Sequence, residues 1–247
     1  MERVKTFIQE RLLPEEAEKL YQQGAKFEEI MMMYGCALRE VQTKLEVLND
    51  ELSVRYNRNP IEFIKTRVKK PLSIVNKLQR RGLEVSIESM VENLNDVAGI
   101  RVICYFLDDI YDVARWLSSQ DDIRLLQVKD YIKNPKPNGY RSLHLIVEVP
   151  VFFSKGRQMM RVEVQIRTIA MDFWASVDHQ LKYKQDIEDV ENADELSAEL
   201  KECADIIAQT DARMQAIKNK IYPGNALPKT NMDKLKKLTI PLNNREI

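Results

Sequence analysis

One segment of this chain constrains the fold more than any other, because its apolar and polar residues alternate without a break. In Arg161–Thr168 the apolar residues are Val162, Val164 and Ile166, and the polar residues between them are Arg161, Glu163, Gln165 and Arg167. Successive side chains of a β-strand point to opposite faces of a sheet. The segment is therefore expected to form a strand with one face packed on a core and one polar face.

Two more segments divide in the same way. Ser142 and His144 alternate with apolar residues in the segment 142–147, and Arg101 alternates with apolar residues in 99–106. If the three strands are in register, one sheet face collects these polar side chains: Arg101, His144, Glu163, Gln165 and Arg167. Such a face could bind a ligand, but the solvated face of an antiparallel sheet has the same pattern. Periodicity alone favours neither interpretation.

Helical spacing of apolar residues brackets these strands. It covers 27–55, and Pro71 followed by Gly82 indicates the start and end of a second helix. Further helices are expected at 108–118, 169–184 and 193–221, and further strands at 125–132, 142–152 and 160–168. The last two strands are separated by a short polar segment and are expected to pair as a hairpin. A central sheet with helices before and after it predicts an α+β core.

The composition limits the partners. Lys plus Arg and Asp plus Glu both number 38 among 247 residues, so the net charge gives no attraction to nucleic acid or to an anionic membrane. The three widely spaced cysteines fit neither a disulfide framework nor a metal cluster. No segment has the apolar length of a signal peptide or a membrane span. We therefore expect a cytoplasmic protein that binds neither DNA nor a membrane, with any anion site formed locally.

A pair of carboxylates could bind a metal ion beside this sheet. Phosphate transfer needs a divalent cation, and Mg²⁺ is usually bound by one or two carboxylates together with substrate oxygens. Asp96, just before a strand, and Glu163, on the polar face, are the available pair. An Asp in that position is ordinarily a cap or turn residue, but basic residues of the kind that bind a triphosphate bracket it in sequence. These residues are Arg67, Lys69, Lys77, Arg80 and Arg101.

Two further residues could recognise a purine base. Tyr140 follows a turn-rich loop at 133–139 and could stack on a base, a contact worth about 1–3 kcal/mol, or it could equally pack at the loop edge. Asp172 could accept hydrogen bonds from N1–H and N2–H₂ of guanine, two donors that adenine does not offer together. Without a ligand it would be an acid on a helix surface.

Taken together, five strings of residues closely resemble the synthetase domain of the RelA/SpoT family over about residues 50–185. They are Arg67–Lys69, Asn95–Arg101, Asn138–His144, Val162–Thr168, and Met171–His179 with Leu181–Lys184. Little but helices lies outside that domain, so the chain is similar to the stand-alone small alarmone synthetases. The RelP kind is the nearer match, because the segment 42–49 is less basic than the stretch that some RelQ relatives use to bind an alarmone allosterically.

The resemblance implies a fold, an activity and a domain organisation. Family members have a mixed sheet, here of about five strands, wrapped by helices and related to nucleotidyltransferases. They transfer the β,γ-pyrophosphate of ATP to the 3′-hydroxyl of GTP or GDP in the stringent response, and they release AMP. The implied units are an N-terminal helical extension at 1–55, a synthetase domain at 56–185, a C-terminal oligomerisation helix at 186–222, and a mobile polar tail at 223–247.

The resemblance also implies roles for individual residues. Asp96 and Glu163 would be the catalytic residues and would bind Mg²⁺. ATP would be bound by Arg67, Lys69, Ser73, Lys77, Arg80 and Arg101, with Arg67 and Arg101 on the two sides of the adenine. GTP or GDP would be bound by Lys129, Lys136, Tyr140, His144, Gln165 and Asp172, with Tyr140 stacked on guanine.

Two properties of the family bear on assembly and on side activities. Small members form homotetramers through their helices, and the amphipathic segments 27–55 and 193–221 could supply the contacts or could instead be buried within one subunit. Bifunctional members carry a hydrolase with a His-Asp metal motif. This chain has only His144 and His179 and no His-Asp dipeptide, so we expect no hydrolase activity.

Two other functions compete with alarmone synthesis. The domain could bind RNA or the ribosome without catalysis, through Tyr140 and nearby lysines, although the balanced charge does not indicate this. It could also be a nucleotidyltransferase with another acceptor, in which Asp96 and Glu163 replace the missing Asp-x-Asp pair.

Overall fold

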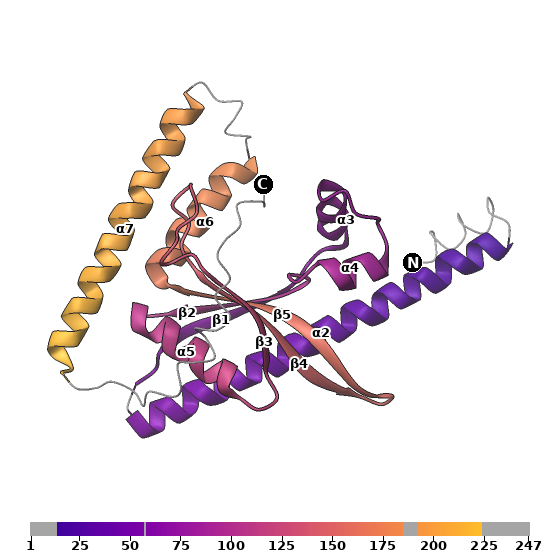
Figure 1. Cartoon of the computed structure of the whole chain (residues 1–247), viewed down its shortest axis with the longest axis horizontal. Coiled ribbons are helices and arrows are strands. Elements are labelled where there is room, and N and C mark those ends of the chain that lie inside the picture. The colour runs from indigo at the N-terminus through magenta and orange to yellow at the C-terminus, as the bar shows by residue number, and fades with distance from the viewer. Residues whose placement is uncertain (1–13, 57, 185–191, 224–247) are drawn as a thin grey trace.

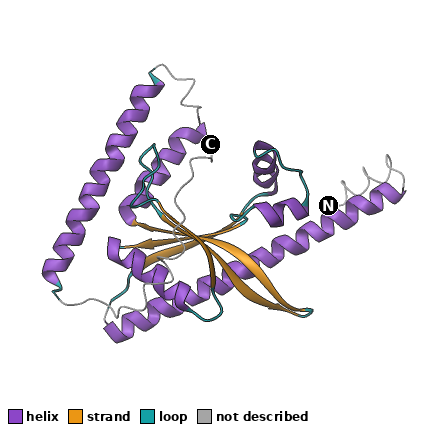
Figure 2. Cartoon of the chain, in the orientation of Figure 1, coloured by secondary structure: helices purple, strands orange, loops and turns teal. Residues whose placement is uncertain are grey.

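A computed structural model describes residues 14–56, 58–184 and 192–223 of the chain, in which a single sheet is surrounded by helices (Figures 1 and 2). In chain order the elements are α2 (Pro14–Tyr56), β1 (Ile61–Val68), α3 (Pro71–Arg80), α4 (Ile87–Asn93), β2 (Ala98–Cys104), α5 (Leu107–Ser119), β3 (Arg124–Asp130), β4 (Leu143–Phe153), β5 (Gly156–Thr168), α6 (Ile169–Lys184) and α7 (Ala193–Ile221).

The five strands form one mixed sheet in the order β1-β2-β5-β4-β3. The central pair, β2 and β5, is parallel, and the other three pairs are antiparallel. The predicted pair of long strands is confirmed, since β5 pairs with the whole length of β4, from Leu143 with Ile166 to Phe153 with Gly156. The α+β fold with a mixed sheet of about five strands is therefore confirmed.

Two elements were absent from the expectations drawn from the sequence, which otherwise located the helices and strands. The strand β1 is an edge strand whose residues are mostly exposed or half-buried, so it lacks the alternation that identified the inner strands. The helix α4 has only 7 residues, too few to show helical periodicity. The predicted tail lies almost entirely in 224–247, which is outside the described residues, and the division into domains stays a prediction.

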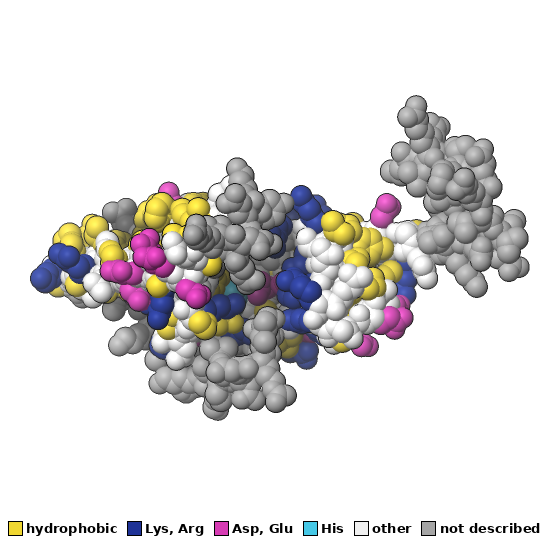
Figure 3. All heavy atoms as spheres, turned by 90° about the horizontal axis from the view of Figure 1, so that it is seen from above, with side chains coloured by type: hydrophobic (Ala, Val, Ile, Leu, Met, Phe, Trp, Pro, Cys, Tyr) yellow, Lys and Arg dark blue, Asp and Glu magenta, His cyan; other side chains and the backbone are white. Residues whose placement is uncertain are grey.

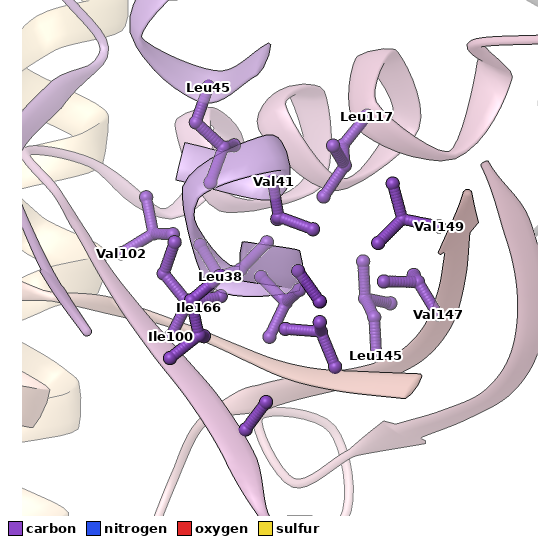
Figure 4. Packing of buried hydrophobic residues seen from close by; sticks show 14 of the residues in the cluster. Leu38, Val41, Leu45, Ile100, Val102, Leu117, Leu145, Val147, Val149 and Ile166 are labelled. Atoms are coloured by element: carbon purple, nitrogen blue, oxygen red, sulfur yellow. The ribbon is translucent and has the colours of Figure 1, made fainter. Parts of the chain in front are cut away.

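The core lies between one face of the sheet and the helices α2 and α5. Figure 4 shows side chains of both helices pointing toward the sheet. Leu38, Val41 and Leu45 come from α2 and Leu117 from α5, and they pack against these residues of the sheet: Ile100, Val102, Leu145, Val147 and Ile166. The apolar half of each alternating strand is thus the core face, which leaves the polar half on the opposite face.

The C-terminal end of the helix α7 is held to α5 by ion pairs of Lys218, whose side chain is buried. Lys218, which is 8% exposed, places Nζ 2.5 Å from Oδ1 of Asp108 at the start of α5. Asp109, next along α5, is 1% exposed and is ion-paired with Arg58.

Within residues 14–56, 58–184 and 192–223, no helix combines the length and the apolar character needed to cross a bilayer.

Replacing Leu45 by Ala tests the packing of α2 on the sheet. Leu45 is 0% exposed, so the variant leaves a cavity, and we expect the free energy of unfolding to fall by about 2–5 kcal/mol. Val47 of the same helix is 59% exposed, and Val47→Ala should change it by less than about 0.5 kcal/mol. Urea denaturation at one protein concentration measures the free energy of unfolding of both variants. An equal decrease in the two variants would contradict the assigned core face.

Candidate active site

The register of the sheet places polar residues of all five strands in one row. Lys65 of β1 pairs with Arg101 of β2, and Arg101 pairs with Gln165 of β5. Gln165 pairs with His144 of β4, and His144 pairs with Lys129 of β3. Directly paired residues point to the same face of a sheet. The three predicted strands are therefore in register, as a common polar face requires.

This polar face is not simply solvated. His144 is 9% exposed and Arg167 is 4% exposed. The side chain of Glu163 is 17% exposed. Because buried polar groups are costly unless they are hydrogen-bonded, a covered polar face needs a network of partners.

Such a network connects Arg167, Tyr140, His144, Glu163 and Gln165. Arg167 donates to the hydroxyl oxygen of Tyr140 and, over 3.0 Å, to Oε1 of Gln165. The Tyr140 hydroxyl lies 2.9 Å from Nε2 of His144, and Nδ1 of His144 lies 3.4 Å from Oε1 of Glu163. Gln165 donates to Oε2 of Glu163 over 2.8 Å.

The protonation of His144 follows from its partners. Burial lowers the pKa of His144, the charges of Arg167 and Lys136 add to this effect, and the influence of Glu163 only partly opposes it, so the ring is neutral near pH 7. An ionised carboxylate can only accept hydrogen bonds. We therefore assign the ring proton to Nδ1, facing Glu163, while Nε2 accepts from Tyr140.

Glu163 is held in its ionised form. Burial acts to raise its pKa, but the hydrogen bonds that it accepts from His144 and Gln165 act to lower it, and the net effect is a lowered pKa. The negative charge of Asp96 also acts to raise the pKa of Glu163, which places the two carboxylates within electrostatic reach of each other.

Among the described residues, only one carboxylate oxygen of Asp96 has hydrogen-bond partners. Its Oδ2 accepts from Nζ of Lys69 over 2.7 Å and from Nζ of Lys77 over 2.8 Å. Burial acts to raise the pKa of Asp96, but these two lysines outweigh it and the pKa is lowered. The other oxygen, Oδ1, is buried without a hydrogen-bond partner among the described residues.

This arrangement fits a divalent cation. Mg²⁺ prefers oxygen ligands such as carboxylates. A buried carboxylate oxygen without a hydrogen-bond partner would be satisfied by a bound cation. In the part of the chain that the structure describes, no three His, Cys, Asp or Glu side chains gather as a metal site. Asp96 and Glu163 would thus supply one or two ligands each, and a bound substrate would supply others.

Local chain geometry brings the lysines to Asp96. The backbone N–H of Lys69 donates to the carbonyl of Val97 over 2.8 Å, so the end of β1 lies beside the start of β2. Pro71 then begins α3, on which Ser73, Lys77 and Arg80 follow at helical spacing. In the space-filling view, Lys and Arg side chains gather beside a hollow at the middle of the molecule (Figure 3).

The structure joins residues that were predicted for the two different nucleotides. Oδ1 of Asp172, in the first turn of α6, accepts from Arg101 over 3.0 Å and from Arg167 over 3.2 Å. Nζ of Lys136 lies 5.6 Å from the centre of the Tyr140 ring. Three other predicted residues are exposed, namely Arg67, Ser73 and Arg80. The nucleotide contacts of all these residues stay predictions.

Arg167 lies at the centre of this network, although the sequence predicted no role for it. It contacts four side chains, those of Tyr140, Ser142, Gln165 and Asp172. Its charge therefore fixes both Tyr140 and Asp172, the two residues expected to meet guanine. Strand alternation had already placed it on the polar face, but only the structure shows its partners.

The sequence and the fold of this chain match those of known proteins. A family model described as a region found in RelA / SpoT proteins matches residues 66–188. The GTP pyrophosphokinase YwaC of Bacillus subtilis is 46% identical over 191 residues, which cover 77% of this chain and 90% of that protein. The chain belongs to the RelA/SpoT family.

Further relatives come from the same organism. The GTP pyrophosphokinase YjbM of Bacillus subtilis is 36% identical over 159 residues, covering 64% of this chain and 74% of that protein. The crystal structure of small alarmone synthetase 2 has a TM-score of 0.70 at 44% identity and covers 78% of this chain and 98% of that chain. The structure of small alarmone synthetase 1 bound to its product pppGpp has a TM-score of 0.73 at 31% identity. It covers 80% of this chain and 98% of that chain.

Replacing Asp96 by Asn removes the counter-charge of two half-buried ammonium groups. We expect the free energy of unfolding at about pH 7 to fall by about 1–3 kcal/mol. Because the folded-state pKa of Asp96 is below its unfolded value near 3.8, its stabilising contribution is present above that value and is lost as the pH falls through the folded-state pKa.

Urea denaturation of the wild type and the variant between about pH 7 and about pH 3 measures this difference. The difference should narrow below about pH 4. Asp121→Asn, at an exposed acid in the turn before β3, serves as the control and should have little effect. A difference that stays constant or widens as the pH falls would contradict the assigned lysine contacts.

Proposed function

We propose that this chain transfers the β,γ-pyrophosphate of ATP to the 3′-hydroxyl of GDP or GTP, releasing AMP and making ppGpp or pppGpp. The observation that carries the proposal is the pair of ionised carboxylates, Asp96 and Glu163, between a lysine cluster and the loop that bears Tyr140. Support also comes from relatives named GTP pyrophosphokinase and from a structure of small alarmone synthetase 1 bound to AMPCPP, which has a TM-score of 0.66 at 28% identity.

The lysine side of the site would receive ATP. Lys69 and Lys77 already meet a carboxylate oxygen, and they would turn to the phosphate oxygens with help from Ser73 and Arg80. Arg67 and Arg101 would lie on either side of the adenine. A guanidinium group is suited to this because it is planar and stacks on aromatic rings.

The tyrosine side would receive GDP or GTP. Arg167 and His144 fix the hydroxyl end of Tyr140, which keeps the ring as a rigid surface for stacking on guanine. Asp172 would accept from the donor edge of the base. Contacts to the sugar and the phosphates would come from Lys129, Lys136, His144 and Gln165.

Catalysis would depend mainly on alignment. Mg²⁺ bound by Asp96 and Glu163 would neutralise the negative charge that develops on the phosphate oxygens. Glu163 would also accept the proton of the attacking hydroxyl, but its lowered pKa makes it a weak base. Most of the rate would therefore come from the side chains that bring the hydroxyl in line with the β-phosphorus.

The reaction is proposed to take place in the cytoplasm and in a homotetramer. The helix α7 presents exposed apolar residues to solvent, namely Ile206, Met214, Ile217 and Ile221. They recur at helical spacing on one side of the helix, as residues of a helix-mediated interface do.

Incubation of the protein with Mg²⁺, ATP and each of GDP, GTP and GMP tests the function. We expect AMP and a pyrophosphorylated guanosine in equal amounts, resolved by ion-exchange chromatography, and neither product when a chelator removes the divalent cation. RNA binding with a steep salt dependence and no turnover would favour the RNA-binding alternative. Release of pyrophosphate in place of AMP would favour nucleotidyl transfer.

Replacing Glu163 by Gln tests the carboxylate pair. The variant keeps the size of the side chain but loses its charge, so we expect kcat to fall by about 100-fold or more. The matched control is Glu148→Gln on the neighbouring strand, where the carboxylate is ion-paired with Arg124 and Arg161. Normal turnover by Glu163→Gln with both nucleotides bound would count against its role, whereas the control should stay within about threefold of the wild type.

A further inference from the structure

We propose that the C-terminal helix α7 forms part of the acceptor site by holding the loop that carries Tyr140. This loop, residues Lys136–Arg141, is called the acceptor loop below. The inference rests on the proposed function, and it concerns a helix that lies outside residues 66–188, which the family model matches. The residues that carry it are Gly139 and Arg141 of the loop and Ala204 and Asp205 of α7.

The backbone of the acceptor loop lies directly against α7. Gly139 has a φ of +88°, a conformation that residues with a side chain rarely adopt. A Cβ atom at this position would lie 2.6 Å from Cβ of Ala204, which is itself 3% exposed. The loop therefore reaches α7 only because Gly139 has no side chain and Ala204 has a small one.

One guanidinium group ties the acceptor loop to α7. Arg141 donates from Nη1 to the carbonyl of Gly139 over 2.9 Å and to the carbonyl of Ala204 over 3.3 Å. From Nη2 it donates to Oδ1 of Asp205 over 2.8 Å. The side chain of Arg141 is only 16% exposed, so its ion pair is better shielded from water than a surface pair.

The same helix also braces the element that carries Asp172. Trp174 of α6 donates from Nε1 to the carbonyl of Leu200 over 2.9 Å. The hydroxyl of Thr168 donates to Oδ2 of Asp211 over 2.5 Å and accepts from the backbone N–H of Met171 over 3.1 Å at the start of α6. Both residues expected to meet guanine, Tyr140 and Asp172, are thus supported from behind by α7.

The contacts form one continuous unit. Tyr140 packs against a buried apolar cluster made by Trp174 and Ala175 of α6 and Ala204 of α7. A loop already fixed in its binding conformation loses little entropy when the ligand arrives, which favours binding. Loosening the loop from α7 should weaken binding of the acceptor nucleotide and leave ATP binding unaffected. The lysine cluster lies elsewhere, because Lys69 follows β1, Lys77 is on α3 and Asp96 precedes β2.

Two variants of the full chain separate the loop from the helix. Asp205→Ala removes the ion-pair partner of Arg141, and Ala204→Leu inserts a side chain where Gly139 lies. Glu202→Ala, at an exposed acid on the same helix, is the matched control, and Asp205→Glu is the conservative rescue. Each protein is assayed for the KM of GTP, for kcat, and for binding of a non-hydrolysable ATP analogue.

We expect Asp205→Ala to raise the KM for GTP by about three- to tenfold, with kcat and the affinity for the ATP analogue within about twofold of the wild type. Ala204→Leu should raise the KM for GTP further. The KM of Asp205→Glu should be close to that of the wild type. Hydrogen exchange provides a readout that does not depend on activity. The N–H groups of Gly139 and Lys136, which are bonded across the loop at 2.8 and 3.2 Å, should exchange faster in both variants.

Unchanged exchange in the loop together with an unchanged KM for GTP would overturn the inference. So would an equal loss of affinity for GTP and for the ATP analogue, which indicates general damage. A wild-type protein that makes no pyrophosphorylated guanosine would refute the proposed function instead, and the exchange measurement would still report whether α7 holds the loop.

Discussion

The pairing of β5 with a parallel strand on one side and an antiparallel strand on the other is the constraint on which the rest of the structure depends. This pairing sets Arg101, Gln165 and His144 side by side on three strands. A shift of β5 by one residue would turn its whole polar set toward the core. The apolar set that packs under α2 and α5 fixes the register, so the same burial that stabilises the fold aligns the site.

The polar face is costly to bury, and its side chains offset that cost by bonding to one another. Arg167 and Gln165 donate, Glu163 and Asp172 accept, and His144 does both. A network in which each member is satisfied is rigid, because no group can move without losing a partner. Among the described residues of this face, the exception is the buried Oδ1 of Asp96, which is the oxygen proposed to bind a cation.

Sequence reasoning found the inner strands and the long helices because burial imposes a period on them. It missed β1, an edge strand exposed along much of its length, and α4, which is too short to repeat a helical period. It placed Arg167 on the correct face but gave it no role, since its partners come from a loop, from its own strand and from a helix. Nothing in the sequence connected Asp205 with Arg141, which is 64 residues away.

The sequence by itself determined the inner strands and the long helices, the polar face of those strands, and the family to which the chain belongs, because these follow from local periodicity and from strings of adjacent residues. Only the tertiary structure decided that Asp96 shares one oxygen between two lysines, that His144 lies between Tyr140 and Glu163, and that α7 packs behind the acceptor loop. Those contacts join residues far apart in the chain, and their geometry is set by how the elements pack in three dimensions.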